Sequence, residues 1–129
     1  MIHILVPYDF SKMAVHALDF ATKLSATYSK LHISLIHVVE LPLNTNAGTI
    51  GGGIDPLSDY QNQVYFRELL EQRKKELDQV QNKYSSPNYR LDTEVQVGNV
   101  FREISTTISE KKPDLVVMGS SGTSGWEEF

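Results

Sequence analysis

The sequence predicts an α/β fold in which an open parallel sheet carries helices on both faces. Short apolar segments rich in β-branched residues alternate along the chain with segments of helical periodicity. Several of the apolar segments are too densely hydrophobic for strands that are exposed on one face. Right-handed crossovers through the helices then bring each strand back parallel to the one before it. With 129 residues, of which 40% are hydrophobic, the chain fits one domain and not two.

The first strand is predicted at residues 2–6, which Pro7 ends. Ser11 is placed to cap a helix that we expect from residue 12 to about residue 28. The second strand is predicted at residues 31–39, and its dense apolar content favours a position in the centre of the sheet. The first helix is indicated by apolar residues at helical spacing, namely Met13, Ala14, Ala17, Leu18, Ala21 and Leu24.

The segment 41–59 is rich in Pro, Asn, Thr and Gly and is predicted to be a long loop. Its Gly51-Gly52-Gly53 run lacks the following Gly-Lys-Ser/Thr of a Walker motif. This run is either a lid over a ligand or, as we favour, a plain connection. From about residue 57 to residue 84, apolar residues recur near one face of a charged segment, which predicts an amphipathic helix.

Residues 91–97 alternate between apolar and polar side chains, which predicts a third strand that Gly98 ends. A third helix is expected to follow, as far as about residue 111. The fourth strand is predicted at residues 115–118, whose length and β-branched content are typical of a buried parallel strand. It leads directly into the glycine-rich segment 119–125.

Charge and composition exclude several classes of function. The net charge of −4 and the pI near 5.5 argue against nucleic acid or an anionic membrane as the main partner, because both need clustered basic residues. The absence of cysteine excludes disulfides, a thiolate nucleophile and cysteine-based metal sites. The four histidines lack the spacing of metal ligands. Because no run of about 18 apolar residues and no signal peptide occurs, we expect a cytoplasmic protein.

A candidate ligand site follows from the predicted topology. Ligands of open parallel sheets bind beyond the carboxyl ends of the strands, where the direction of winding reverses. If the first and fourth strands are neighbours there, Pro7-Tyr8-Asp9 and Gly119-Ser120-Ser121-Gly122 face each other across one crevice. Glycines let backbone N–H groups turn toward an anion such as phosphate. The alternative for the glycine and serine segment is a flexible loop.

Asp9, at the end of a predicted strand, is the residue that we expect to contribute most to binding, since a carboxylate accepts hydrogen bonds from the donor groups of a ligand. The alternative is a turn in which Asp9 acts together with Ser11. His37 lies inside an apolar run and is predicted to be a hydrogen-bonded core histidine, not a catalyst. Ser120 and Ser121 lack the Gly-x-Ser-x-Gly elbow of serine hydrolases.

Four segments stand in a specific order and spacing, namely Ile4-Leu-Val-Pro7-Tyr-Asp9-Phe-Ser11, Ile36-His37-Val38-Val39, Val95-Gln-Val97-Gly98 and Asp114-Leu-Val-Val-Met-Gly119-Ser-Ser-Gly122. Their combination resembles the universal stress protein family, and the match spans nearly the whole chain. The resemblance implies a Rossmann-like fold similar to that of adenine nucleotide hydrolases, with the strand order 3-2-1-4-5. It also implies a place for a nucleotide.

In the nucleotide-binding members of that family, the phosphates lie on a Gly-x2-Gly-x9-Gly-Ser/Thr segment. Gly119 and Gly122 match the first half of this motif, and the second half falls beyond Phe129. The resemblance also implies one more helix and a fifth strand beyond that point. We therefore expect residues 1–129 to be a single domain that is truncated at its C-terminus, or the front of a longer tandem protein.

Carried over by position, Asp9 would contact the adenosine, Val38 would offer backbone groups to the adenine edge, and Met118 would help to wall the pocket. The resemblance implies ATP or AMP as the ligand, alone or with Mg²⁺. Phosphate would be held by backbone amides from Gly119 onward and by nearby hydroxyls. The full set of expected binding residues is Pro7, Tyr8, Asp9, Ser11, Val38, Met118, Gly119, Ser120, Ser121, Gly122 and Thr123.

The expected function is that of an adenine-nucleotide-binding domain in stress-response signalling. No general base is recognisable for efficient hydrolysis, so we expect at most slow ATP turnover. We expect a homodimer, or pairing with a second stress-protein domain, and neither nucleic acid nor membrane as a partner. One alternative is a nucleotide-free dimerisation or adaptor module of the same family. A second is an adenylating or flavoprotein-type enzyme of the same broad fold.

Overall fold

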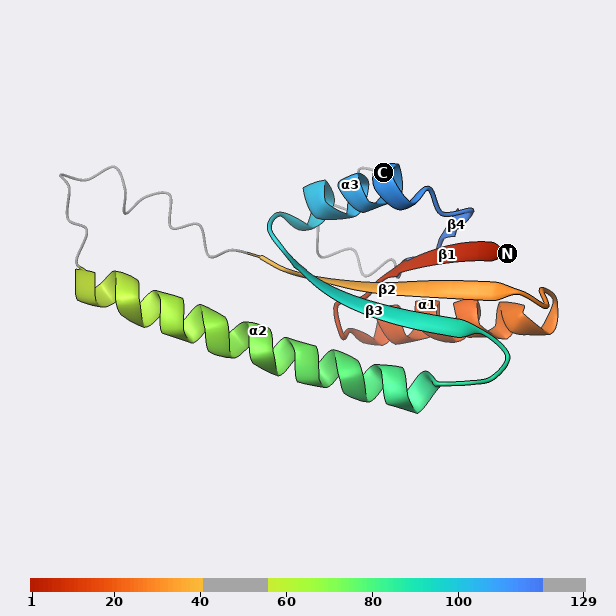
Figure 1. Cartoon of the computed structure of the whole chain (residues 1–129), viewed down its shortest axis with the longest axis horizontal. Coiled ribbons are helices and arrows are strands. Elements are labelled where there is room, and N and C mark those ends of the chain that lie inside the picture. Colours follow the sequence, from red (N-terminus) through yellow and green to blue (C-terminus); the bar gives the residue numbers. More distant parts are fainter. Residues whose placement is uncertain (41–55, 120–129) are drawn as a thin grey trace.

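The computed structural model describes residues 1–40 and 56–119. Its four described strands form one parallel sheet in the order β3-β2-β1-β4, with α1 and α2 on one face and α3 on the other (Figure 1). The elements are β1 (Ile2–Pro7), α1 (Lys12–Lys23), the short 3-10 helix η1 (Leu24–Ala26), β2 (Leu31–Val39), α2 (Pro56–Tyr84), β3 (Arg90–Val97), α3 (Val100–Lys111) and β4 (Leu115–Val116). The predicted α/β fold is confirmed, and so is the neighbouring position of the first and fourth strands.

The core lies on both faces of the two inner strands, β1 and β2. Alternate residues of each strand point to opposite faces, so Ile4 and Val6 face α1 and α2 while Leu5 faces α3. Nearly every residue of β2 is buried, which confirms its predicted central position. On the α3 side the core is smaller and consists of Leu5, Ile36 and Ile104 with partly buried neighbours.

Helix α1 begins where the sequence predicts and ends earlier. The Oγ atom of Ser11 accepts a hydrogen bond from the N–H group of Ala14 at 3.1 Å, so the predicted cap is confirmed. The prediction of a helix to about residue 28 is wrong, because α1 ends at Lys23 and tightens into η1. The hydroxyls of Thr22 and Ser25 donate to backbone carbonyls three residues earlier, an arrangement that competes with a regular helix end.

Helix α2 is the predicted amphipathic helix, and it begins at Pro56. Leu77 is fully buried against the sheet, and Val80 and Tyr84 pack beside it. The Tyr84 hydroxyl donates a hydrogen bond of 2.7 Å to Asp19 of α1, which ties the two helices together. With 29 residues at about 1.5 Å each, α2 is longer than the strand it covers and begins well beyond the carboxyl ends of the strands (Figure 1).

Strand β4 differs from its prediction. A buried strand was expected at residues 115–118, but the strand comprises only Leu115 and Val116, and 42% of Leu115 is exposed. Within the described residues β4 pairs with β1 alone, so it forms an edge of the sheet. An apolar run does not distinguish an edge strand from an inner one, which explains the error. Backbone bonding to β1 continues as the N–H group of Val117 donates to the carbonyl of Leu5.

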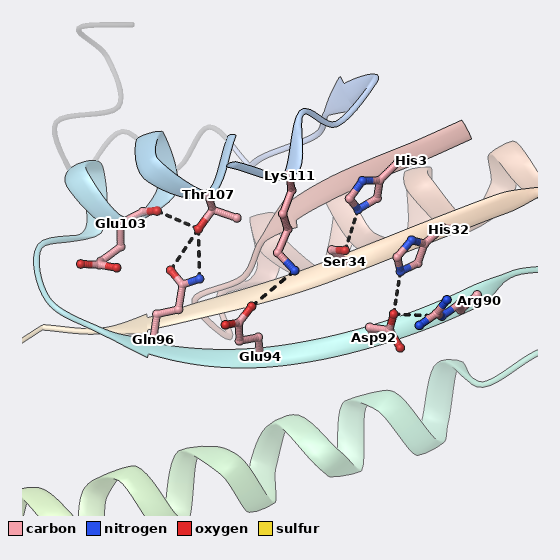
Figure 2. A network of polar contacts seen from close by, with 10 residues as sticks. All are labelled: His3, His32, Ser34, Arg90, Asp92, Glu94, Gln96, Glu103, Thr107 and Lys111. Carbon is pink, nitrogen blue, oxygen red and sulfur yellow. Dashed lines mark hydrogen bonds and ion pairs between the residues drawn. The ribbon is translucent and has the colours of Figure 1, made fainter. Parts of the chain in front are cut away.

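The α3 face of the sheet becomes polar toward the amino ends of the strands (Figure 2). The imidazoles of His3 and His32 stack with their centroids 4.5 Å apart and their planes within 8°. Nε2 of His3 lies 2.7 Å from Oγ of Ser34, and His32 donates to Asp92 at 2.6 Å. Arg90 also pairs with Asp92, at 3.0 Å. Two imidazoles in such close contact disfavour a second positive charge.

We predict that stability falls on acidification partly because of His3. Burial is the main cause that lowers the pKa of His3 below 6.5, and His32 and Lys111 lower it further, against the opposite effect of Asp114 and Asp92. The unfolded chain therefore takes up the proton first, so the stability contributed by neutral His3 is present above pH 6.5 and is lost as the pH falls through the folded pKa.

Urea unfolding at about pH 7.5 and about pH 5.5 measures this loss. The variant His3→Gln, whose amide can replace Nε2 opposite Ser34, is expected to lose less stability between the two pH values than the wild type. His16→Gln, which changes an exposed histidine of α1, serves as the control and should behave like the wild type. An equal loss in all three proteins would contradict the assignment.

Candidate functional site

A cavity of about 110 Å³ lies at the carboxyl ends of β1 and β2, between the starts of α1 and α3. This is the position where ligands of open parallel sheets bind. It is formed by the end of β1 and the loop after it, the end of β2, the first turns of α1 and α3, and the chain after β4. The lining residues are Pro7, Tyr8, Asp9, Ser11, Ala14, Ile36, His37, Val38, Val100, Ile104, Met118 and Gly119.

Every sequence-predicted site residue that the structure describes lines this cavity. These residues are Pro7, Tyr8, Asp9, Ser11, Val38, Met118 and Gly119. The other predicted residues, Ser120, Ser121, Gly122 and Thr123, lie outside the described residues, as do residues 41–55 of the loop predicted at 41–59. The last four residues of that predicted loop belong to α2, so its predicted end is wrong. The sequence reasoning missed the apolar wall made by Val100 and Ile104, although their spacing of four on one helix face was a usable signal.

The backbone of Val38 is open toward the cavity because β1 ends before β2 does. Pairing between the two strands stops where Pro7 lies opposite Ile36, and the carbonyl of Ile36 accepts a final hydrogen bond from the N–H group of Tyr8. Backbone groups of residues two apart in a strand point to the same side. The N–H and C=O groups of Val38 therefore point to the side that β1 has left.

Asp9 begins the turn that leads into α1. Its Oδ1 atom accepts a hydrogen bond of 3.0 Å from the N–H group of Ser11, and Ser11 in turn caps the helix. The turn that we considered as the alternative role of Asp9 is therefore present. The residue is exposed, and no described residue hydrogen-bonds to its Oδ2 atom. One carboxylate oxygen thus shapes the loop, and the other is available as an acceptor toward a ligand.

His37 is a core histidine with a hydrogen-bond partner, as predicted. Only 8% of the residue is exposed, and its Nδ1–H group donates a hydrogen bond of 2.7 Å to the carbonyl of Tyr8. Burial is the main cause that lowers the pKa of His37, and the bond to Tyr8 opposes this effect. Burial likewise raises the pKa of the Tyr8 hydroxyl. Both groups therefore remain uncharged at neutral pH.

Gly119 is required by packing, whatever the cavity binds. A Cβ atom at this position would lie 2.6 Å from the backbone carbonyl carbon of Met13 and 2.7 Å from its Cβ atom. These contacts are shorter than real Cβ contacts, and the backbone of α1 is not free to yield as a flexible side chain would. The absence of a side chain at Gly119 lets the chain after β4 approach the first turn of α1.

Two helices direct their amino ends toward the cavity. Ser11 caps α1 and Asn99 caps α3, and residues of the first turn of each helix line the cavity. The amino end of a helix carries a partial positive charge and unpaired N–H groups, both of which favour an anion. Residues 1–40 and 56–119 contain no cluster of three His, Asp or Glu residues that could hold a metal ion.

The sequence profile of the universal stress protein family matches residues 1–129. The chain belongs to the universal stress protein family. No protein of curated function was found to be similar in sequence. In the parts of this universal stress protein that the structure describes, no helix is long and apolar enough to cross a membrane.

Solved structures show the same fold. A universal stress family protein from Burkholderia pseudomallei is 23% identical, with a TM-score of 0.67 over 93% of this chain and 82% of its own. The universal stress protein UspA from Lactobacillus plantarum is 22% identical, with a TM-score of 0.58 over 99% and 83%. A family protein from Arabidopsis thaliana with AMP bound is 16% identical, with a TM-score of 0.55 over 97% and 80%.

We predict that Gly119→Ala lowers the free energy of unfolding by about 1–3 kcal/mol, because the added methyl group forces α1 and the chain after β4 apart. Urea unfolding measures the change. Thr27→Ala, which changes an exposed residue after η1, is the control and should leave the free energy of unfolding nearly unchanged. A Gly119→Ala protein as stable as the wild type would show that Gly119 is not needed for packing.

Proposed function

We propose that this universal stress protein binds an adenine nucleotide, ATP or AMP, in the cavity at the carboxyl ends of β1 and β2. The observation that supports this most is the convergence of Asp9, Val38 and Gly119, from three separate parts of the chain, on one cavity at the point where the winding reverses. The nucleotide serves as a signal in a stress response, and catalysis is a minor activity.

The residues that line the cavity offer groups that match the base and the ribose of a nucleoside. The open N–H and C=O groups of Val38 match the donor and acceptor edge of adenine, and Oδ2 of Asp9 accepts from a ribose hydroxyl. Ile104 and Val100 provide an apolar surface for the base. The distant Arabidopsis thaliana relative with AMP bound supports a nucleotide as the ligand.

The size of the cavity indicates which part of the nucleotide the described residues hold. Small-molecule sites usually have volumes of about 300–1,000 Å³, whereas this cavity measures about 110 Å³. This volume supports a site in which the described residues hold the base and part of the ribose. We place the phosphates toward Gly119 and the segment Ser120, Ser121, Gly122 and Thr123, with the amino ends of α1 and α3 favouring their negative charge and Mg²⁺ as an optional companion.

Asp9→Asn and Asp9→Ala test this assignment together. Asn keeps an oxygen for the N–H group of Ser11 but replaces the second acceptor by a donor, so the turn survives while the ligand loses its partner. Because a hydrogen bond to a charged group contributes about 1.5–3 kcal/mol, both variants should bind AMP and ATP about 10- to 100-fold more weakly in isothermal titration calorimetry.

Asp78→Ala, which removes an exposed carboxylate of α2, is the matched control and should bind like the wild type. A wild-type protein that takes up neither AMP nor ATP would refute the proposal and favour the nucleotide-free adaptor. Rapid, metal-dependent ATP turnover that is abolished in Asp9→Ala would instead show an enzyme. Bound flavin, seen in the absorbance spectrum, would indicate the flavoprotein alternative.

We further infer that the protein self-associates as a homodimer or pairs with a second stress-protein domain. Within the described residues both edges of the sheet, β3 and β4, lack a further strand, and Leu115 at the β4 edge is 42% exposed. Unpaired edges with apolar side chains favour association. A cytoplasmic location stays a prediction from the sequence.

Sedimentation velocity tests the association, and we expect a species of twice the chain mass of 14.6 kDa. Leu115→Lys places a charge at the exposed β4 edge and should shift the protein toward the monomer. Phe20→Lys, which changes an exposed side chain of α1 instead, should leave the dimer intact. A wild-type protein that stays monomeric at all concentrations would contradict the inference.

A further inference from the structure

The loop that carries Asp9 contains a backbone conformation that its sequence does not favour. Phe10, between Asp9 and Ser11, has a φ of 65°, which lies in the left-handed region. This region is costly for a bulky residue and persists only where the surroundings impose it. Because Asp9 and Ser11 both line the cavity, whatever holds Phe10 in this conformation also sets the direction of the Asp9 carboxylate.

Three side chains contact the ring of Phe10, one from the same loop and two from β2 and α2. Tyr8 contacts it edge to face with centroids 5.0 Å apart, and His37 of β2 does the same at 4.8 Å. The guanidinium of Arg73 in α2 lies 5.9 Å from the ring centroid. Edge-to-face aromatic contacts have a preferred geometry, so they fix the ring in position as well as burying it.

The peptide on the other side of Asp9 is fixed by the same histidine. The Nδ1–H group of His37 donates to the carbonyl of Tyr8 at 2.7 Å, while the N–H group of Tyr8 donates to the carbonyl of Ile36 at 2.8 Å. Asp9 therefore lies between a carbonyl that His37 holds and a ring that His37 contacts. One buried side chain controls both flanks of the exposed carboxylate.

We propose that Phe10 and His37 are positioning residues that hold Asp9 in its ligand-binding orientation, with Arg73 extending the support to α2. This inference rests on the proposed nucleotide function, since it assigns these residues to the same site. Neither side chain needs to touch the ligand. They act by reducing the conformational freedom that binding would otherwise remove from the loop.

Variants of Phe10 separate the effect of its ring from the effect of its backbone conformation. Phe10→Gly accepts a positive φ without strain but lacks the ring, so it leaves the left-handed conformation allowed and no longer enforced. If the ring positions Asp9, Phe10→Gly should bind AMP about tenfold more weakly in calorimetry. If the left-handed conformation of Phe10 only costs free energy and does not orient Asp9, the variant should bind AMP as well as or better than the wild type. That result would overturn the proposal.

Variants of His37 test the hydrogen bond to Tyr8. His37→Asn keeps an N–H donor close to the Nδ1 position, whereas His37→Leu keeps an apolar side chain and removes the donor. We expect His37→Leu to weaken AMP binding about tenfold, and His37→Asn, which keeps the donor and loses only the ring contact with Phe10, to weaken it less. Equal losses in both variants would show that His37 only fills space, and thermal unfolding checks that both remain folded.

Arg73 has a matched control on its own helix. Lys83 lies 5.9 Å from the ring of Tyr84, the same distance as that of Arg73 from the ring of Phe10, but away from the cavity. Arg73→Met should weaken AMP binding about two- to fivefold, while Lys83→Met should have no effect. Equal effects from both variants would overturn the role of Arg73, and since both side chains are at least partly exposed, neither change should prevent folding.

Hydrogen exchange separates failure of this inference from failure of the proposed function. The amide of Ser11 donates to Oδ1 of Asp9, so its exchange rate reports the order of the loop in the absence of any nucleotide. Phe10→Gly and His37→Leu should exchange this amide faster than the wild type, and His37→Asn should accelerate the exchange less than His37→Leu does. If the wild type binds no nucleotide but these rates change, only the proposed function fails. Unchanged rates would refute the positioning role itself.

Discussion

The whole site depends on the difference in length between the two inner strands. β1 ends at Pro7 opposite Ile36, whereas β2 continues for three more residues to Val39. That overhang leaves the backbone of Val38 open, places His37 beside the carbonyl of Tyr8, and gives the loop before α1 room to turn. A longer β1 would pair with the overhang and fill the cavity with its own backbone. The register of one pair of strands thus creates one wall of the cavity.

Packing requires a residue without a side chain at the other side of the cavity. Gly119 lacks a side chain because α1 passes too close for a Cβ atom, and the same lack of a side chain would let backbone groups approach a phosphate. The first turn of α1 therefore contacts the chain after β4 directly. This contact joins the amino end of α1 to the cavity, so the helix and the glycine form one wall.

The sequence predicted the elements that depend on local patterns. The cap at Ser11 and the central β2 follow from residue types, and the meeting of Asp9 with Gly119 follows from the rule that places ligands at the carboxyl ends of strands. Val38 was placed at the cavity only by the resemblance to the universal stress protein family. The early end of α1 and the short β4 were missed, because side-chain bonds to the backbone and edge position are not visible in apolar periodicity. The support of Phe10 was missed for another reason.

That support joins residues that are far apart in the chain, and no local pattern marks it. Phe10 looks like an ordinary hydrophobic residue, and His37 like an ordinary core histidine, until the fold brings their rings to 4.8 Å. A left-handed backbone at a phenylalanine is not predicted by its own preferences, because tertiary contacts impose it. The backbone conformation of Phe10 and its contact with His37 are therefore the features of the loop that the sequence predicts least well.

The unequal pairing of the strands has a consequence for how the sheet opens. β1 pairs with β2 at six positions and with β4 at two, so the described part of β4 is attached far more weakly than the strands on the other side. Local opening is easiest where the fewest bonds must break. A molecule that contacts both Val38 and Gly119 would link the firmly paired strands β1 and β2 to the weakly paired chain around β4. Its binding would therefore make local opening of the β4 edge less frequent.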